Sequence, residues 1–246
     1  MIKIDGVSVL TDPILLSHVS FLHRIGGAVD PAQYADTDIV LISHLHQDHC
    51  DLQSLYRLRH ATIVVPRGAG AFIKARAMCP HVIELGQGES LEINGLIVTA
   101  VHADHDGSRV PIGGRAAQAL GYVVTGHSGT FYFAGDTDIY PEMSNLPNPE
   151  SDSIDLAFMP VWGWGPNLGP GHMNPQRAAE SLRLIEPGIA IPIHWGGLHP
   201  VGMSKMMQLR HLLDRPPLDF AEQAAEIAGS TKVIVLNPGE QIGGVV

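Results

Sequence analysis

The segment His44-Leu45-His46-Gln47-Asp48-His49 carries four side chains that bind transition metals. Imidazole and carboxylate ligands suit zinc and its first-row neighbours. Structural zinc sites usually favour cysteine, whereas nitrogen and oxygen ligands are typical of a catalytic site that keeps one coordination position open. The segment therefore predicts a catalytic metal site.

An apolar run, Asp38-Ile39-Val40-Leu41-Ile42-Ser43, directly precedes this segment and predicts a buried strand that leads into a loop. Because side chains alternate along a strand, His44 and His46 can point to the same side. Asp48 and His49 lie beyond the turn and can reach a second ion. The alternative, unrelated surface histidines in a chain with 14 of them, does not explain a ligand cluster directly after a strand.

Three further candidate ligands follow other predicted strands. His102 follows the strand at 96–101, Asp136 follows 130–134, and His194 follows 189–193. Strand ends are where a rigid scaffold presents functional side chains to loops. The resulting seven ligands are too many for one tetrahedral ion, but they suit two ions that share one carboxylate.

Turn and cap residues indicate the elements that must position these ligands. Asp5-Gly6 and Asn94-Gly95 predict tight hairpins, and residues 126–129 predict another. Asn174-Pro175 predicts a helix start, and further helices are expected at 51–59, 68–78, 201–213 and 218–228. Strand-rich blocks and helices occur in two halves. We therefore expect an α/β (α+β) fold, a four-layer αββα sandwich of two mixed sheets with helices outside, formed by residues 1–246 as one domain.

Composition excludes some classes of partner and of protein. The formal net charge of −10 argues against nucleic acid, because phosphate binding needs a basic face. A small-molecule substrate, an anionic one included, remains compatible, since bound metal ions add positive charge. Two cysteines without a Cys-x-x-Cys motif, no signal-peptide pattern in residues 1–6 and no membrane span lead us to expect a cytoplasmic protein. The sequence does not predict an oligomeric state.

The order of these motifs resembles that of the metallo-β-lactamase superfamily. His-x-His-x-Asp-His, a lone His, Gly-Asp-Thr and a second lone His each follow a strand, over nearly the whole chain. The resemblance is to the branch holding ascorbate-6-phosphate lactonase and N-acyl-phosphatidylethanolamine phospholipase D, and it implies the same αββα fold. The finer pattern that carries it is Thr11-Asp12-Pro13, Tyr132-Phe133-Ala134-Gly135-Asp136-Thr137, Asp155-Leu156-Ala157 and His172-Met173-Asn174-Pro175.

The resemblance implies roles for the ligands. It implies two ions about 3.5–4 Å apart, with a hydroxide between them that attacks the substrate. Superfamily enzymes that keep the bridging aspartate mostly cleave phosphoesters, thioesters or lactones, so we do not expect an antibiotic-resistance enzyme. By position, His44, His46 and His102 would bind one metal, Asp48, His49 and His194 the other, and Asp136 both.

Two residues are candidates for catalysis besides the metals. Asp48 is placed to orient the hydroxide. His172 lies just before the helix cap Asn174, beside a helix N-terminus that favours anions. We expect His172 to protonate the leaving group or to hold the oxyanion; the alternative is an ordinary loop histidine.

Other residues are candidates for the surroundings of the site. Asp12 is either a partner of a ligand histidine or a turn aspartate before proline. Trp162 and Trp164 are candidates for the pocket wall, although one of them could be core. His199 and His105 could reach the rim, but a solvated loop position is the expectation for each. Arg109 could bind a substrate anion, but a surface position is the expectation. Cys50 could be a metal ligand, but a small buried thiol is expected because the ligand set is already complete.

These observations predict a metal-dependent hydrolase with two divalent ions, zinc first and Mn²⁺ or Fe²⁺ as alternatives. The substrate would be a small ester, lactone or phosphodiester. One alternative is a nuclease of the same superfamily, which the acidic charge disfavours. Another is a redox di-iron protein, which usually has Glu where His46 stands and carries a flavin domain. A non-catalytic metal-binding protein is the third.

Overall fold

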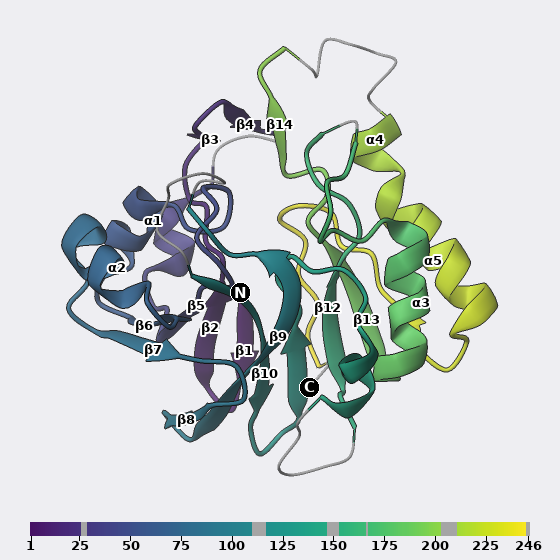
Figure 1. Ribbon diagram of the computed structural model, residues 1–246, viewed down its shortest axis with the longest axis horizontal. Coiled ribbons are helices and arrows are strands. Elements are labelled where there is room, and N and C mark those ends of the chain that lie inside the picture. Colours follow the sequence, from purple (N-terminus) through teal and green to yellow (C-terminus); the bar gives the residue numbers. More distant parts are fainter. Residues whose placement is uncertain (26–28, 110–116, 147–152, 166, 203–210, 245–246) are drawn as a thin grey trace.

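The computed structural model describes all residues except 26–28, 110–116, 147–152, 166, 203–210 and 245–246. Two mixed β-sheets pack face to face, and helices cover the outer face of each (Figure 1). The predicted αββα arrangement is therefore confirmed. None of the helices in the described ranges is both long and apolar enough to cross a membrane.

The first sheet has five strands in the order β1-β2-β5-β6-β7. The β1–β2 hairpin turns at Asp5-Gly6, as predicted, and the steps from β2 to β7 are all parallel. Helices α1 and α2 connect its parallel strands. The elements are β1 (Ile2–Ile4), β2 (Val7–Thr11), β5 (Ile39–Leu41), α1 (Leu52–Arg57), β6 (Thr62–Pro66), α2 (Gly70–Ala77) and β7 (Val82–Leu85).

The second sheet has seven strands in the order β15-β13-β12-β11-β10-β9-β8. Strands β8 to β11 are antiparallel, whereas β11, β12, β13 and β15 are parallel. Helices α3 and α5 lie on its outer face. The elements are β8 (Ser90–Ile93), β9 (Leu96–Asp106), β10 (Gln118–Thr125), β11 (Thr130–Phe133), β12 (Leu156–Pro160), α3 (Pro175–Ile185), β13 (Ile189–Ile193), α4 (His211–Asp214), α5 (Pro216–Ile227) and β15 (Lys232–Val233).

Strand β5 shows why its sequence is continuously apolar. Ile39 and Leu41 face the core between the two sheets, whereas Val40 and Ile42 face the core under α1 and α2. A parallel strand covered on both faces has no polar side to present, so alternation of apolar and polar residues is lost. The strand leads directly into the His44–His49 segment, so its buried residues define where that segment begins.

The structure contains short elements in two segments, 14–36 and 141–145, where the sequence predicted none. Residues 14–36, which lack a clear pattern, include strands β3 (His18–Val19) and β4 (Leu22–Arg24) and the 3-10 helix η1 (Pro31–Tyr34). With β14 (Leu198–Pro200), these strands form a small antiparallel sheet. Most of the helix expected at 201–213 lies outside the described residues. A second 3-10 helix, η2 (Pro141–Asn145), follows the Gly-Asp-Thr segment.

Candidate metal centre

The loop after β5 presents the His-x-His-x-Asp-His segment as a tight turn. The backbone N–H groups of His49 and Cys50 both donate to the carbonyl of His46. Directly afterwards, the Asp51 carboxylate accepts from the backbone N–H of Ser54 and caps α1. The strand before the loop and the capped helix after it fix both ends, so the ligand side chains start from a defined backbone.

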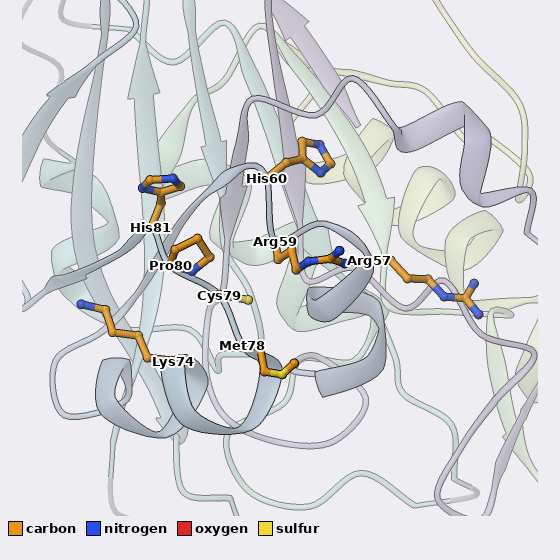
Figure 2. Close-up of a pocket in the computed structure, with 8 residues that line it drawn as sticks. All are labelled: Arg57, Arg59, His60, Lys74, Met78, Cys79, Pro80 and His81. Atoms are coloured by element: carbon orange, nitrogen blue, oxygen red, sulfur yellow. The ribbon is translucent and has the colours of Figure 1, made fainter.

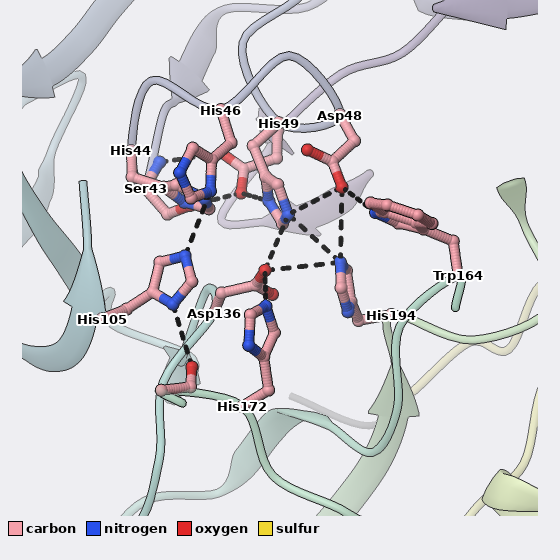
Figure 3. Close-up of polar contacts among 12 residues, drawn as sticks. Ser43, His44, His46, Asp48, His49, His105, Asp136, Trp164, His172 and His194 are labelled. Atoms are coloured by element: carbon pink, nitrogen blue, oxygen red, sulfur yellow. Dashed lines mark hydrogen bonds and ion pairs between the residues drawn. The ribbon is translucent and has the colours of Figure 1, made fainter. Parts of the chain in front are cut away.

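One group of histidine nitrogens lies on the β9 side of this loop (Figure 3). His44 Nε2 is 2.9 Å from His46 Nδ1, and His46 Nδ1 is 3.1 Å from His105 Nε2. Ligands held tetrahedrally at 2.0–2.1 Å from zinc are about 3.3 Å apart. The three nitrogens are thus spaced closely enough to share one ion.

A second group contains two histidines and two carboxylates (Figure 3). His49 Nε2 is 3.2 Å from His194 Nε2 and 3.1 Å from Asp136 Oδ2. Asp136 Oδ2 is 3.4 Å from His194 Nε2, and Asp48 Oδ2 is 3.9 Å from His49 Nε2. The ligand atoms of Asp48, His49 and His194 form a metal-sized cluster, and Asp136 lies beside it.

The outer nitrogens of these imidazoles bond to fixed acceptors. His105 Nδ1 lies 2.9 Å from the carbonyl of Gly171, and His194 Nδ1 lies 2.8 Å from the carbonyl of Trp162. A carbonyl can only accept, so each Nδ1 carries a hydrogen, and the inward Nε2 is the nitrogen that can offer a lone pair to a cation. Inward lone pairs repel one another unless a cation lies between them, which is the arrangement that ligand histidines have.

Asp12 organises two of the ligands. Its Oδ2 accepts from His49 Nδ1 at 2.7 Å and from the Ser43 hydroxyl at 2.5 Å, and its Oδ1 accepts from the Ser43 backbone N–H at 2.7 Å. The Ser43 hydroxyl oxygen in turn lies 2.9 Å from His44 Nδ1. The carboxylate therefore fixes the ring orientation of His49 directly and that of His44 through Ser43. Of the two readings of Asp12, the structure favours the partner of a ligand histidine.

Burial keeps part of the cluster uncharged. Desolvation lowers the pKa of His44 well below its ordinary value and that of His105 to about 4. Burial also lowers the pKa of His46. A ligand imidazole must be neutral, because a protonated ring has no lone pair to give. These three side chains are therefore in the protonation state that a metal ion needs at neutral pH.

The ionised state of Asp136 is due to its neighbours and not to burial. Burial alone would raise the pKa of this carboxyl, but the adjacent His194 and His49 hold it well below its ordinary value. Its Oδ1 is buried and has no hydrogen-bond partner in the described part of the chain. An ionised, buried carboxylate with an orphaned oxygen is costly, and a cation at this point would satisfy it. The residues present therefore fit a metal centre.

The prediction for His102 differs from the structure. Strand β9 does not end at Val101 but continues to Asp106, so His102 lies within the strand. Residues three apart in a strand face opposite sides, so His102 and His105 cannot both face the centre. The His102 ring instead packs edge-on against Tyr140, with ring centroids 4.8 Å apart, and His105 lies beside His44 and His46.

Backbone hydrogen bonds hold His105 in place. The backbone N–H of Leu45 donates to the carbonyl of Gly107, and the Asp104 carbonyl accepts from the N–H of Asp138. The end of β9 is thereby tied both to the loop after β5 and to the segment after β11. The sequence contains a signal for this, because His105 also lies near the end of an apolar strand, but pattern alone did not separate it from His102.

Gly135 permits the close approach of the Asp136 segment. Its φ is +63°, and a Cβ at this position would lie 2.6 Å from Ser43 Cβ. Any other residue would be strained and would push Asp136 away from the loop after β5. The glycine of the Gly-Asp-Thr motif is thus explained by sterics.

The structure places His172 beside Asp136. Its Nε2 is 3.4 Å from Asp136 Oδ2, and its Nδ1 faces the carbonyls of Gly169 and Pro170 at 3.2 Å. Burial disfavours the charged ring, but the bond to Asp136 raises the pKa of His172 above its ordinary value. His172, His105 and Asp136 also form a metal-sized group, so this histidine directly adjoins the ligand cluster.

Of the two tryptophans, Trp164 contacts a candidate ligand, Asp48. Its indole N–H donates to Asp48 Oδ2 at 3.0 Å, and its ring meets the Phe21 ring edge-on at 5.2 Å. Phe21 is 54% exposed and belongs to the β3–β4 hairpin that the sequence did not predict. Trp162 takes part through its carbonyl, while its indole N–H donates to the Gly165 carbonyl.

Three other candidates lie as follows. His199 is buried in β14, where its Nδ1 faces the Pro200 carbonyl at 2.8 Å. Cys50 is a buried free thiol, as predicted. Arg109 is not a free surface residue, because its guanidinium donates to the carbonyls of Leu45 and Cys50 at 3.1 and 2.6 Å. It clamps the His44–His49 loop at both ends, a role that only the folded chain reveals.

Comparison with known proteins agrees with this geometry. Residues 8–195 match the model of the β-lactamase superfamily domain. The chain is 31% identical to a UPF0173 metal-dependent hydrolase of Methanopyrus kandleri, over 97% of this chain and 93% of that protein. It is 27% identical to N-acyl-phosphatidylethanolamine-hydrolyzing phospholipase D 1 of Caenorhabditis elegans, over 98% of this chain and 72% of that protein.

Solved structures share the fold. A metallo hydrolase of the archaeon Ignicoccus hospitalis superposes with a TM-score of 0.70 at 21% identity, covering 98% of this chain and 91% of that one. An isothiocyanate hydrolase from Delia radicum gut bacteria has a TM-score of 0.71 at 18% identity, covering 97% and 93%. Family model, relatives, fold and the histidine–aspartate cluster agree. The chain therefore belongs to the metallo-β-lactamase superfamily and is one of its metal-dependent hydrolases.

Proposed function

We propose that this protein hydrolyses a small ester, lactone or phosphodiester with the help of two divalent metal ions, zinc being the expected metal. The observation that carries this proposal is the convergence of the His49 and His194 imidazole nitrogens on the buried, ionised Asp136, whose second oxygen has no partner in the described chain. Such an arrangement is unfavourable without cations and suited to them.

The ligands divide into two sets around one carboxylate. His44, His46 and His105 would hold one ion, and Asp48, His49 and His194 would hold the other. Asp136 would contact both, since it adjoins His49 and His194 and also groups with His105. Two such ions supply a water whose pKa is lowered to about 7 and a positive charge that polarises the scissile carbonyl or phosphoryl oxygen.

Two side chains of this protein would act on the substrate. Trp164 fixes the Asp48 carboxylate through its indole N–H, so Asp48 can orient the attacking water. His172 would donate a proton from Nε2 to the leaving group, since Nε2 faces the centre and lies 3.4 Å from Asp136 Oδ2. Its Nδ1 contacts with the Gly169 and Pro170 carbonyls hold the ring in one orientation.

The surroundings favour a small substrate with an apolar part. Phe21 and Trp164 form an aromatic pair beside Asp48, and aromatic walls are typical of small-molecule sites. The similarity to a phospholipase D that hydrolyses N-acyl-phosphatidylethanolamine supports the phosphodiester among the three substrate classes.

The test combines elemental analysis with a substrate screen. We expect two metal ions per chain and turnover of one class among bis(p-nitrophenyl) phosphate, simple lactones, esters and thioesters. Chelator and Asp136→Ala should both abolish that turnover. His172→Ala should keep both metals and lose roughly 10²–10⁴-fold in rate, whereas His127→Ala, an exposed turn residue, should change neither. Turnover that persists in chelator would refute the mechanism.

A further inference from the structure

A second region of the chain has an unusual charge. Five of the 15 Lys and Arg residues fall within residues 52–83, together with two histidines, and none of the 25 Asp and Glu residues does. In a chain with a net charge of −10, this segment is strongly basic. The basic residues are Arg57, Arg59, His60, Arg67, Lys74, Arg76 and His81.

The fold gathers most of this charge around one hollow. Arg57, Arg59, His60, Lys74 and His81 line a surface hollow of about 670 Å³. Figure 2 shows their side chains around it, contributed by α1, α2 and the loops before β6 and β7. A smaller hollow of about 400 Å³ adjoins it, shares Arg57 and adds Arg76. We call these two hollows the basic groove.

The larger hollow of the basic groove lies at the opposite end of the first sheet from the metal centre. Arg59 and His60 come just before β6, and His81 comes just before β7, so they lie at the amino ends of these strands. The metal-binding loop follows the carboxyl end of β5, which is parallel to β6. A five-residue strand spans about 15 Å, so an anion in the larger hollow does not touch the candidate metal ligands.

Within the part of the chain that the structure describes, no carboxylate pairs with the Arg and Lys side chains that line the groove. Among the described residues, Arg57, Lys74 and Arg76 form no ion pair, and no carboxylate lines either hollow. Arg59 donates to the Tyr56 carbonyl and stacks over the Tyr56 ring at 4.3 Å, which leaves its charge unpaired. Neighbouring Arg67, by contrast, pairs with Glu89.

The shape and chemistry of the groove favour phosphate. Guanidinium groups bind phosphate oxygens bidentately, and several together suit a group with more than one negative charge. Exposed Tyr56 and Met78 lie beside the cations. We propose that the basic groove binds a phosphate-bearing anion, supplied either by a soluble polyphosphate compound or by the headgroup of an anionic lipid.

The experiment compares two charge-removal variants of the full-length, metal-loaded protein. Arg57→Gln/Lys74→Gln changes the groove. Arg183→Gln/Lys232→Gln removes the same charge from exposed positions on the second sheet and its helix α3. Neither pair belongs to the metal centre, so the hydrolase rate on an uncharged ester should be unchanged in both and reports correct folding.

Two probes distinguish the sources of phosphate at an ionic strength of about 0.15 M. One is inorganic pyrophosphate, measured by calorimetry. The other is phosphatidylcholine vesicles with about one third phosphatidylglycerol, compared with pure phosphatidylcholine, measured by cosedimentation. Because each basic residue contributes roughly fivefold to binding at an anionic surface, the groove variant should bind about 25-fold more weakly and the control variant should match the parent protein.

The binding results identify the source of the phosphate or overturn the proposal. Groove-dependent binding of pyrophosphate alone indicates a soluble ligand, and groove-dependent binding of vesicles alone indicates a lipid headgroup. If both bind, the probe with the larger groove-dependent loss identifies the source. Equal binding by the groove variant, the control variant and the parent protein overturns the proposal, because the anion then binds elsewhere, the metal centre included. No binding of either probe overturns it as well.

Discussion

Replacing His105 or His102 by alanine tests the ligand assignment directly. The two residues lie three positions apart on β9, yet only His105 directs a nitrogen to within 3.1 Å of His46 Nδ1. His102 packs against Tyr140 instead. His105→Ala should therefore remove one ligand of the ion held by His44 and His46, whereas His102→Ala should leave both ions bound.

The expected magnitudes are well separated. Loss of a hydrogen-bond partner behind a ligand costs about 10–100-fold in metal affinity, so loss of the ligand itself should cost at least about 100-fold, or roughly 2.7 kcal/mol. His102→Ala removes one edge-on ring contact at 4.8 Å and should lower the free energy of unfolding by about 1 kcal/mol. Metal affinity should not change, because the His102 ring contacts no candidate ligand in the described structure.

Competition with a chromophoric chelator measures this difference. Each variant is loaded with zinc, titrated with chelator and then analysed for residual metal. Urea unfolding of the two apo proteins provides the stability control, so that a loss of metal through misfolding is recognised. Metal loss in His102→Ala together with full retention in His105→Ala would refute His105 as the ligand and support His102, the residue that the sequence predicted.

Four further predictions follow from individual contacts. Asp12→Asn keeps the size of the side chain but not its charge, so it should weaken the hydrogen bond to His49 and lower metal affinity about 10–100-fold by chelator titration; unchanged affinity would exclude Asp12 from positioning the ring. Arg109→Met leaves the Leu45 and Cys50 carbonyls without this donor and should cost about 1–3 kcal/mol in urea unfolding, with Arg109→Lys recovering part of it; equal losses in both variants would speak against the clamp. Gly135→Ala combines a positive φ with the close approach to Ser43 and should destabilise the protein by about 2–4 kcal/mol; a fold of normal stability would contradict the steric argument. Burial raises the pKa of Cys50 to about 12, so iodoacetamide at a pH of about 8 should leave this thiol unmodified in the folded protein and alkylate it after unfolding. Above a pH of about 9 the unfolded chain loses the Cys50 proton, whereas the folded chain keeps it up to a pH of about 12. The protonated thiol therefore contributes its full share of the free energy of unfolding below a pH of about 9, and this share declines as the pH rises towards 12.

Local sequence determined much of the scaffold. The Asp5-Gly6 and Asn94-Gly95 turns, the Asn174 cap and the strand before His194 all appear where the pattern predicts them. Each depends on interactions within a few residues: positive φ in a tight turn, a side chain that accepts a backbone N–H, or an apolar run. The His44–His49 segment could be recognised for the same reason, since its side chains and the strand before them are contiguous.

The choice between His102 and His105 required the tertiary structure. The end of β9 is set by pairing with β10, including an irregular register between Gln118 and Leu120, and by the hydrogen bonds of Gly107 and Asp104 to other segments. None of these partners is adjacent in sequence. A strand that continues for a few residues changes which side chain faces the centre, because direction alternates at every residue.

The environment of the centre likewise depended on distant residues. Asp12 reaches His49, Arg109 reaches the Leu45 carbonyl, and Phe21 reaches Trp164. The sequence by itself determined which side chains could bind metal and where the turns and caps fall. Only the folded chain decided which histidine nitrogens converge on the centre and which ring nitrogens bond to backbone carbonyls. It also decided which Arg and Lys side chains gather in the basic groove. Ligand type is a property of single residues, whereas direction, burial and unpaired charge arise from segments brought together by packing.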